Sequence, residues 1–346
     1  MGLSFRSVIA AIAAFVALPA LGFHSGGVGA CSGCHETHPT QATGPSLLRV
    51  DNPTDLCLQC HETGNGNSWG THPLSPGPLY GGGQFVFLLE DNLNDGPGGN
   101  DPLNWIPGHQ AGHNVVSIAH GTDADPDFLM SPGGSYPSSN LHCTSCHDPH
   151  GRGGHFRLLY GDDFPEAQVN GEVFTYTRPA PEAVGIALDG PEESDVNHTA
   201  YLSGTSEWCS NCHALYHDGS GTGLEHPSGE ILDSDIIDMY DNYRGTGFLD
   251  GDGTQAYLAT VPIEFPGSTT TFRGPTPMTA RVTCLSCHRA HASSGPRSGR
   301  WDFNIATWVE EGVLSGSYAI PNPYDATAGP AQGRLCEKCH GQNVPE

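Results

Sequence analysis

The sequence predicts a mostly irregular chain with short helices and few strands. Glycine (47) and proline (28) together make up more than a fifth of the 346 residues, and hydrophobic residues make up only 36%. Stretches such as residues 91–101 (DNLNDGPGGND) show neither the helical nor the strand period. A five-residue motif, Cys-x-x-Cys-His, occurs six times. The apolar core of such a chain is thin, so we expect the groups bound at these motifs to complete it.

The motif is the attachment signature of a c-type haem, in which two thiols bond the vinyl groups and the adjacent imidazole binds the iron. A zinc site, a thioredoxin-like redox pair or a disulfide framework would explain the cysteine pairs. None of these explains the histidine that follows every pair. We therefore predict six covalently bound haem c groups and no disulfide. The thiols belong to Cys31, Cys34, Cys57, Cys60, Cys143, Cys146, Cys209, Cys212, Cys284, Cys287, Cys336 and Cys339.

The first 22 residues predict a signal peptide. One basic residue, Arg6, precedes an apolar run over residues 8–21, and small residues at positions 20 and 22 suit cleavage before Phe23. A membrane anchor is the alternative, but the run is short and contains Pro19. We expect an exported protein without membrane insertion, whose residues 23–346 form one hexahaem unit. Without haem, we expect this chain to be unfolded.

Regular structure is predicted at few places in the mature chain. We expect one-turn helices at the motifs, a helix over residues 231–244, and strands over residues 84–90 and 172–177. The motifs have no fixed spacing, which excludes a solenoid. The first, third and fifth motifs continue to a second histidine as CHxxH. This alternation suggests three haem pairs, approximately residues 23–75, 113–227 and 278–346.

The net charge of −25 narrows the range of partners. An acidic chain with a single lysine, Lys338, is unsuited to nucleic acid or to anionic membrane surfaces. Haem propionates would add to this charge. A solvated, secreted surface is the simplest interpretation, and attraction of metal cations or cationic partners is a second one.

Each haem iron has two axial positions, and the motif histidines fill one position each. An enzyme would leave one iron open or replace a motif histidine by lysine, and no CxxCK motif is present. Histidine at both positions gives closed irons suited to electron transfer, so we predict no catalytic residue. The proximal ligands are His35, His61, His147, His213, His288 and His340.

Steric considerations narrow the choice of distal ligands among the other histidines. His38, His150 and His291 lie three residues after a proximal histidine, and His142 directly precedes Cys143. None of these four can reach the far face of its own haem, so each would ligate the haem of another motif and bring two haems into contact. His72, His113 and His226 are equally suited to ligand and structural roles, and His24 and His217 are weaker candidates. Structural roles are assigned to His109, His120, His155 and His198.

Several segments resemble a known family. They are FHSGGV at 23–28, GPSLL at 44–48, GHNVV at 112–116, LHCTSCHDPHG at 141–151, SEWCSNCH at 206–213, CLSCHRAHAS at 284–293 and LCEKCH at 335–340. These segments resemble the hexahaem outer-surface c-type cytochromes of metal-reducing bacteria, the filament-forming cytochrome nanowires. The resemblance is specific around the motifs and fades over residues 152–205.

The resemblance implies a polymer in which the haems form one continuous stack. In that family the position of His38 ligates the fifth haem of the adjacent subunit, which here is the haem of His288. We hypothesise that each CHxxH histidine ligates the haem two motifs earlier, so that His150 serves the first haem and His291 the third. For the second, fourth and sixth haems we favour His113, His142 and His226, without assigning each to one haem.

The predicted function is extracellular electron transfer through a head-to-tail filament. Expected partners are other copies of the chain, outer-membrane electron conduits, extracellular metal oxides and other cells. One alternative is a monomeric periplasmic electron shuttle in which His38 ligates a haem of its own chain. A multihaem oxyanion reductase is a second alternative, and it would require an open iron.

Overall fold

The computed structural model describes residues 31–36, 47–62, 81–89, 93–94, 105–169, 172–186, 193, 196–217, 228–242, 257, 259, 261–272, 279–293 and 295–300. The predicted signal peptide, the sixth motif and the candidates His24, His38, His72 and His226 lie outside these residues. Within the described part, no helix is long and apolar enough to cross a membrane.

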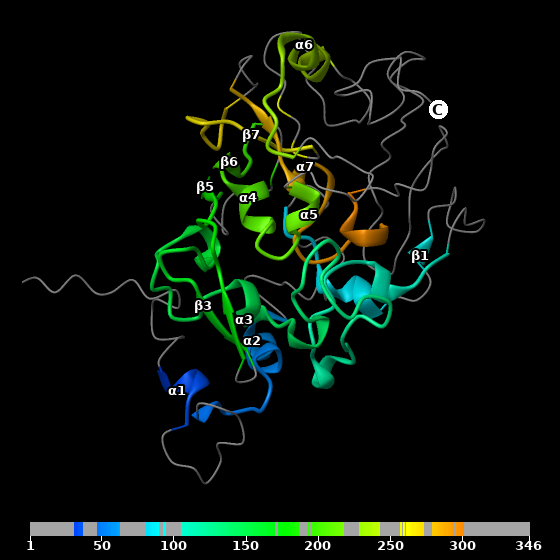
Figure 1. The fold of residues 1–346 in the computed structure, drawn as a ribbon, viewed down its shortest axis with the longest axis vertical. Helices are drawn as coiled ribbons and strands as arrows, with labels where there is room; N and C mark the ends of the chain where they lie inside the picture. Colours follow the sequence, from blue (N-terminus) through cyan, green and yellow to red (C-terminus); the bar gives the residue numbers. More distant parts are fainter. Residues whose placement is uncertain are drawn as a thin grey trace, which may run out of the picture.

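The helices are short, and most of them carry a predicted haem-attachment motif. Single turns α1 (Cys31–Cys34), α3 (Cys143–Cys146) and α7 (Cys284–Cys287) end just before their motif histidine. The second motif lies inside α2 (Pro53–His61), and the fourth lies between α4 (Thr205–Cys209) and α5 (Ala214–His217). Figure 1 shows α1 near the lower end of the molecule, α2 and α3 above it, and α4, α5 and α7 higher still.

The start of α2 is determined by its sequence. Asn52 is the N-cap, and its side-chain oxygen accepts hydrogen bonds from the backbone N–H groups of Thr54 and Asp55 at 2.7 and 3.2 Å. Pro53 occupies the first turn, where no N–H is needed. Asp55 adds a negative charge near the positive end of the helix dipole. These features place the second motif at the end of a stable helix.

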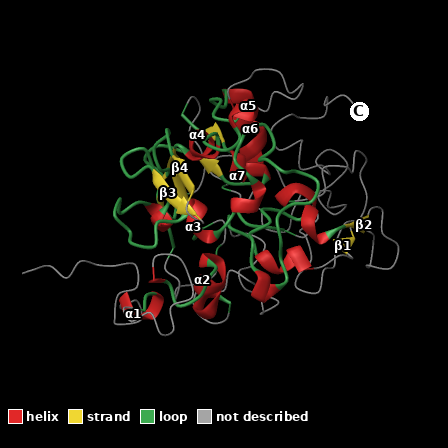
Figure 2. Cartoon of the chain, turned by 60° about the horizontal axis from the view of Figure 1, so that its bottom comes forward, coloured by secondary structure: helices red, strands yellow, loops and turns green. Residues whose placement is uncertain are grey.

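In the part of the chain that the structure describes, the strands form three small sheets. Two are antiparallel hairpins: β1 (Leu93–Asn94) with β2 (Trp105–Ile106), and β3 (Glu166–Val169) with β4 (Glu172–Thr175). The third has the order β5 (Glu182–Val184), β6 (Ala200–Ser203), β7 (Ile263–Glu264) and β8 (Arg281–Val282), with β6 and β7 parallel and the other neighbours antiparallel. Figure 2 shows the β3–β4 hairpin beside α3.

The apolar core of the described residues is divided into three small clusters. The largest packs Ile237 and Tyr240 of α6 (Ser234–Asn242) against Val261 and Ile263. The second joins Leu58 of α2 to the segments around residues 85–88 and 111–115, and the third joins Tyr160, Ala167 and Tyr176. No cluster connects all the motif helices of the described part, which agrees with a chain whose core is completed by bound groups.

Most of the predicted elements are present, and one is wrong. The helix expected over residues 231–244 is α6, and the strand expected over residues 172–177 is β4. Residues 84–90 were predicted to form a strand but contain a 3-10 helix, Phe85–Leu89. Phe85, Phe87 and Leu88 are all buried, so this run is apolar without alternation, a pattern that a buried helical turn and a buried strand share.

Candidate haem-binding sites

Cysteines of successive motifs lie close together in the fold. The thiol of Cys57 lies beside that of Cys143, and the thiol of Cys209 lies beside that of Cys284. Each pair consists of the first cysteines of two motifs. The second motif therefore adjoins the third, and the fourth adjoins the fifth. Cys34 also lies near Cys57, and Cys146 lies near Cys212, so the first motif approaches the second and the third approaches the fourth.

The two joints are built in the same way. The hydroxyl of Thr54, three residues before Cys57, accepts the backbone N–H of Cys143 at 3.4 Å. The hydroxyl of Ser206, three residues before Cys209, accepts the backbone N–H of Cys284 at 3.2 Å. A helix carrying an even-numbered motif thus anchors the first turn of the following odd-numbered motif in both cases.

Three pairs of histidine rings in the described part of the chain have similar distances between their centroids. The ring centroids are 6.2 Å apart for His35 and His150, 6.4 Å for His147 and His291, and 5.9 Å for His113 and His213. A metal–imidazole bond is about 2 Å long, so two imidazoles on opposite sides of one metal hold their centroids roughly 6 Å apart. Each pair joins one motif histidine to one predicted distal ligand. The donor set and its spacing fit bis-histidine haem iron.

Backbone carbonyls orient four of the candidate ligand imidazoles. Nδ1–H of His147 donates to the carbonyl of Arg157 at 2.7 Å, and that of His213 donates to Pro132 at 2.8 Å. His288 donates to Arg297 at 2.9 Å, and His113 donates to Ala290 at 2.7 Å. A carbonyl can only accept, so Nδ1 carries the proton and Nε2 is the nitrogen left to bind a metal.

The distal candidates His113 and His291 come from adjacent extended segments. The backbone N–H of His291 donates to the carbonyl of Gly82 at 2.7 Å. The backbone N–H of His113 donates to the carbonyl of His291 at 2.8 Å. Gly83 has a φ of +68°, and a Cβ there would lie 2.0 Å from the carbonyl oxygen of Ala292, so only glycine permits this approach. One layered arrangement of segments thus places both candidates.

Burial favours the neutral form of the His113 and His291 imidazoles. Burial, together with the nearby His213, lowers the pKa of His113 to about 4. Burial, together with His147 and His113, lowers the pKa of His291 to about 3. A neutral imidazole has the lone pair that a metal requires.

Comparison with known proteins agrees with this geometry. Residues 24–66 match a family model described as a doubled CXXCH motif. The chain is 29% identical to the C-type cytochrome OmcS of Geobacter sulfurreducens over an alignment of 439 positions that covers 99% of each chain. This chain is thus similar to a c-type cytochrome over nearly its whole length.

Two solved structures with similar folds are described as an outer-membrane cytochrome S filament and as OmcS nanowires, both from Geobacter sulfurreducens. Their TM-scores are 0.67 and 0.66, and they are 26% and 27% identical to this chain. Each comparison covers 93% of this chain and 100% of the other. The similarity extends far beyond the motifs, so it includes the irregular segments that place the histidines.

Histidines assigned to structural roles use Nε2 in contacts with the protein. His109 contacts Asp127 at 3.0 Å, His155 contacts Asp163 at 3.1 Å, and Nε2 of His198 donates to the carbonyl of Phe272 at 2.7 Å. Nε2 of His120 lies 3.6 Å from Glu62. By contrast, Nε2 of His113, His147 and His213 has no hydrogen-bonding partner among the described residues.

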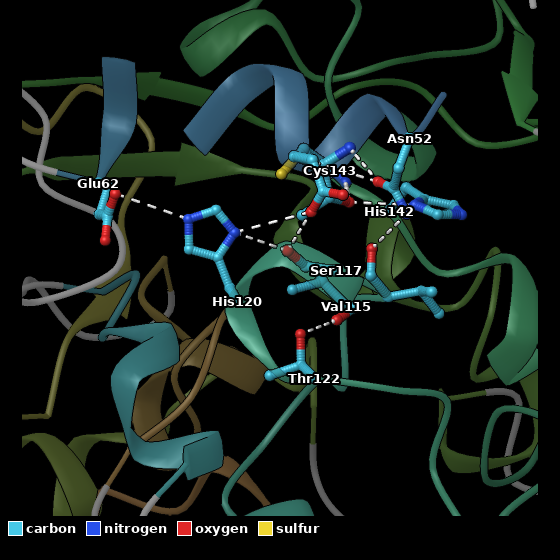
Figure 3. A network of polar contacts seen from close by, with 11 residues as sticks. Asn52, Glu62, Val115, Ser117, His120, Thr122, His142 and Cys143 are labelled. Carbon is cyan, nitrogen blue, oxygen red and sulfur yellow. Dashed lines mark hydrogen bonds and ion pairs between the residues drawn. The ribbon is translucent and has the colours of Figure 1, made fainter. Parts of the chain in front are cut away.

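His142 occupies a separate position beside the second motif. It is the N-cap of α3, is 1% exposed, and its Nδ1 lies 3.0 Å from the hydroxyl of Thr54 on α2. Burial lowers its pKa. Figure 3 shows His142 and Cys143 beside Asn52, with Ser117 and His120 nearby in the same polar network. The weaker candidate His217 contacts the hydroxyl of Ser228 at 3.2 Å.

Sequence reasoning missed the groups that support the ligands. The carbonyls of Arg157, Pro132, Arg297 and Ala290 belong to the backbone, so residue identity gives no sign of them. The hydroxyls of Thr54 and Ser206 did leave a signal, because each lies three residues before the first cysteine of an even-numbered motif.

Proposed function

We propose that this cytochrome is exported and polymerises head to tail into an extracellular filament for long-range electron transfer. The observation that carries the proposal is similarity to OmcS over 99% of both chains, because solved structures of OmcS are described as filaments and nanowires. The similarity to a cytochrome implies an electron-transfer protein, and bound haem supplies one-electron chemistry.

Six haems follow from the six motifs, and each part of a motif has its own task. The cysteines attach the macrocycle, and the motif histidine takes the proximal position on the iron. A second histidine at the distal position closes the iron to substrates. Backbone carbonyls hold Nδ1–H of four candidates, which fixes the orientation of these imidazoles and increases their basicity; they are His113, His147, His213 and His288. The residues therefore favour electron transfer over catalysis.

The ring pairs support the hypothesis about the CHxxH histidines. His150 faces the motif histidine of the first haem, and His291 faces that of the third. Each serves the haem two motifs earlier. For His38 no earlier motif exists in the same chain, so the equivalent position is the haem of His288 in an adjacent subunit. A head-to-tail contact of this kind generates an open filament unless the rotation closes a ring.

The two even–odd joints order the motifs within the described part of the chain. Thr54 and Ser206 connect the second motif to the third and the fourth to the fifth. The sixth motif has Gly333 in place of this hydroxyl, so the joint does not extend to it. The proposed subunit interface therefore rests on His38.

The other distal positions follow from proximity. His113 faces His213 and is proposed to ligate the fourth haem. His142 contacts α2, which carries the second motif, and is proposed to ligate the second haem. The sixth haem is then left to His226. His72, His24 and His217 remain weaker candidates.

Export and partners complete the proposal. The apolar segment before Phe23 would act as a signal peptide, and the polymer would lie outside the cell or on its surface. Electrons would enter from outer-membrane electron conduits and leave to metal oxides or other cells. The net charge of −25 supports a solvated secreted surface that binds neither nucleic acid nor anionic membranes.

Replacement of His38 tests the filament. We expect His38→Ala to abolish or strongly shorten secreted filaments in negative-stain micrographs and to leave one iron per subunit without its distal imidazole. His109→Ala is the matched control, because His109 contacts Asp127 instead of facing a motif histidine. Normal filaments with every haem low-spin in His38→Ala would refute cross-subunit ligation. A wild-type protein that is only monomeric would favour the shuttle.

A further inference from the structure

The three odd-numbered motifs share a returning loop. After each CHxxH the chain turns back and forms an antiparallel bridge to the motif histidine. The residue after that histidine donates its N–H to the loop, and a later loop residue donates to the carbonyl of the second motif cysteine. The bridges are His35 with Leu48, His147 with Leu159, and His288 with Gly299.

Each loop contains left-handed residues that are not glycine. Arg157 and Leu158 have φ values of 50° and 58°, and Arg297 and Ser298 have values of 56° and 57°. Leu47 has a φ of 62° at the position equivalent to Leu158 and Ser298. Among the described residues, these five are all the non-glycine residues with positive φ. An unfavourable conformation that recurs at equivalent positions indicates a common role.

The first left-handed residue supplies the carbonyl that orients the proximal histidine. Arg157 accepts from Nδ1–H of His147, and Arg297 accepts from Nδ1–H of His288. The next residue accepts the backbone N–H that follows the histidine, at 2.8 Å for Leu158 and 2.7 Å for Ser298. Two successive left-handed residues thus turn two carbonyls toward one side of the loop, where the motif lies.

We propose that this left-handed clamp, residues 156–159 and 296–299, is a positioning element that sets the orientation and basicity of the proximal imidazoles of the third and fifth haems. A carbonyl on Nδ1–H makes the imidazole a stronger donor, which favours the ferric iron and lowers the reduction potential. The fourth motif achieves this differently, because His213 donates to Pro132 in a distant segment. The proximal imidazoles of the third and fifth haems are therefore oriented by a nearby left-handed loop, whereas that of the fourth is oriented by a distant segment.

Paired substitutions at Arg157 isolate the backbone from the side chain. The Arg157 side chain is exposed, and its guanidinium lies 5.5 Å from the Phe156 ring. Arg157→Gly and Arg157→Val both remove the guanidinium. Glycine adopts a positive φ freely, whereas a β-branched valine opposes it. The two variants therefore differ chiefly in whether residue 157 can keep its positive φ.

We expect Arg157→Gly to keep the low-spin EPR signals and to change a potential only through the loss of the guanidinium charge, which acts on His147 and His291. Relative to Arg157→Gly, we expect Arg157→Val to shift one haem to a more positive potential and to change one low-spin signal, because that signal depends on the angle between the imidazole planes. The angle is 65° for His147 and His291 in the folded chain. Spectroelectrochemical titration and EPR of the purified holoprotein measure both effects.

Arg297→Gly and Arg297→Val repeat the comparison at the fifth haem. Arg157→Ala is a milder variant if valine prevents folding, and it should give a smaller shift in the same direction. The proposal would be overturned if the glycine and valine variants had the same reduction potentials and the same EPR signals, whether or not these differ from the wild type. The proposal rests on His147 and His288 as proximal ligands and not on polymerisation. A failure to form filaments would therefore leave this test unchanged.

Discussion

The histidines of this chain differ in whether the protein occupies Nε2. Ligand candidates such as His147 and His113 donate Nδ1–H to a carbonyl, and no described residue accepts from or donates to their Nε2. His109 uses Nε2 to contact a carboxylate, and His155 does the same while donating Nδ1–H to Leu159. A metal needs the lone pair of Nε2, so these contacts separate ligand candidates from structural histidines.

Removal of a distal histidine should open one iron. We expect His150→Ala and His291→Ala each to produce one high-spin haem per chain that binds carbon monoxide when reduced, whereas the wild type binds none. Absorbance difference spectra with carbon monoxide give the stoichiometry. His155→Ala serves as the control, since His155 donates to Leu159 and contacts Asp163. Carbon monoxide binding to the wild-type protein would instead favour the reductase alternative.

Among the elements, the joints between motif helices determine which haems are neighbours. The helices that carry the third and fifth motifs are single turns, too short to be stable alone. Each is held by a hydroxyl from the preceding even-numbered helix and by a capping box that begins at His142 or Thr283. The arrangement of cofactors thus depends on a few side-chain hydrogen bonds between short elements.

Loss of one joint hydroxyl should weaken the fold measurably. Ser206 is fully buried and accepts the N–H of Cys284 at 3.2 Å. Ser206→Ala leaves that N–H unpaired, which we expect to lower the free energy of unfolding by about 1 to 3 kcal/mol. Guanidinium denaturation followed by haem absorbance measures the change.

Ser203→Ala is the matched control for the joint. The Ser203 hydroxyl contacts Glu182 at 3.4 Å on the exposed side of β6, so its loss should change the free energy of unfolding by less than about 0.5 kcal/mol. Equal losses for Ser203→Ala and Ser206→Ala would show that the joint contributes nothing specific.

For the molecule as a whole, the polypeptide is too irregular to fold on its own apolar residues. In the described part, three separate clusters supply most of the buried apolar side chains, and the strands are at most four residues long. Each haem adds a rigid apolar body held by two covalent bonds. The net charge of −25 opposes collapse through self-repulsion. Folding should therefore depend on haem attachment.

Expression without haem attachment tests this dependence. We expect the exported chain, produced in cells that lack the attachment machinery, to show no cooperative thermal transition by circular dichroism and to be rapidly proteolysed. The holoprotein of the same sequence, produced in competent cells, should unfold cooperatively. A cooperative transition in the haem-free chain would show that the three clusters suffice.

The sequence alone predicted covalently bound haem c, six attachment sites and their proximal ligands. Attachment requires two thiols and an imidazole within one turn, so all three lie in five consecutive residues. It also predicted α6 and β4, whose side chains have a clear local period. It was wrong for residues 84–90, because an apolar run without alternation fits a helical turn and a strand equally well.

Only the tertiary structure decided which distal candidates face which motif, because these partners come from distant segments. Sequence separation gives no distance between His113 and His213 or between His35 and His150. The carbonyls that orient the imidazoles depend on backbone conformation, and the clamp uses left-handed arginine and serine residues that ordinary propensity disfavours. Local chemistry therefore places each haem on the chain, whereas the fold determines what lies opposite its iron.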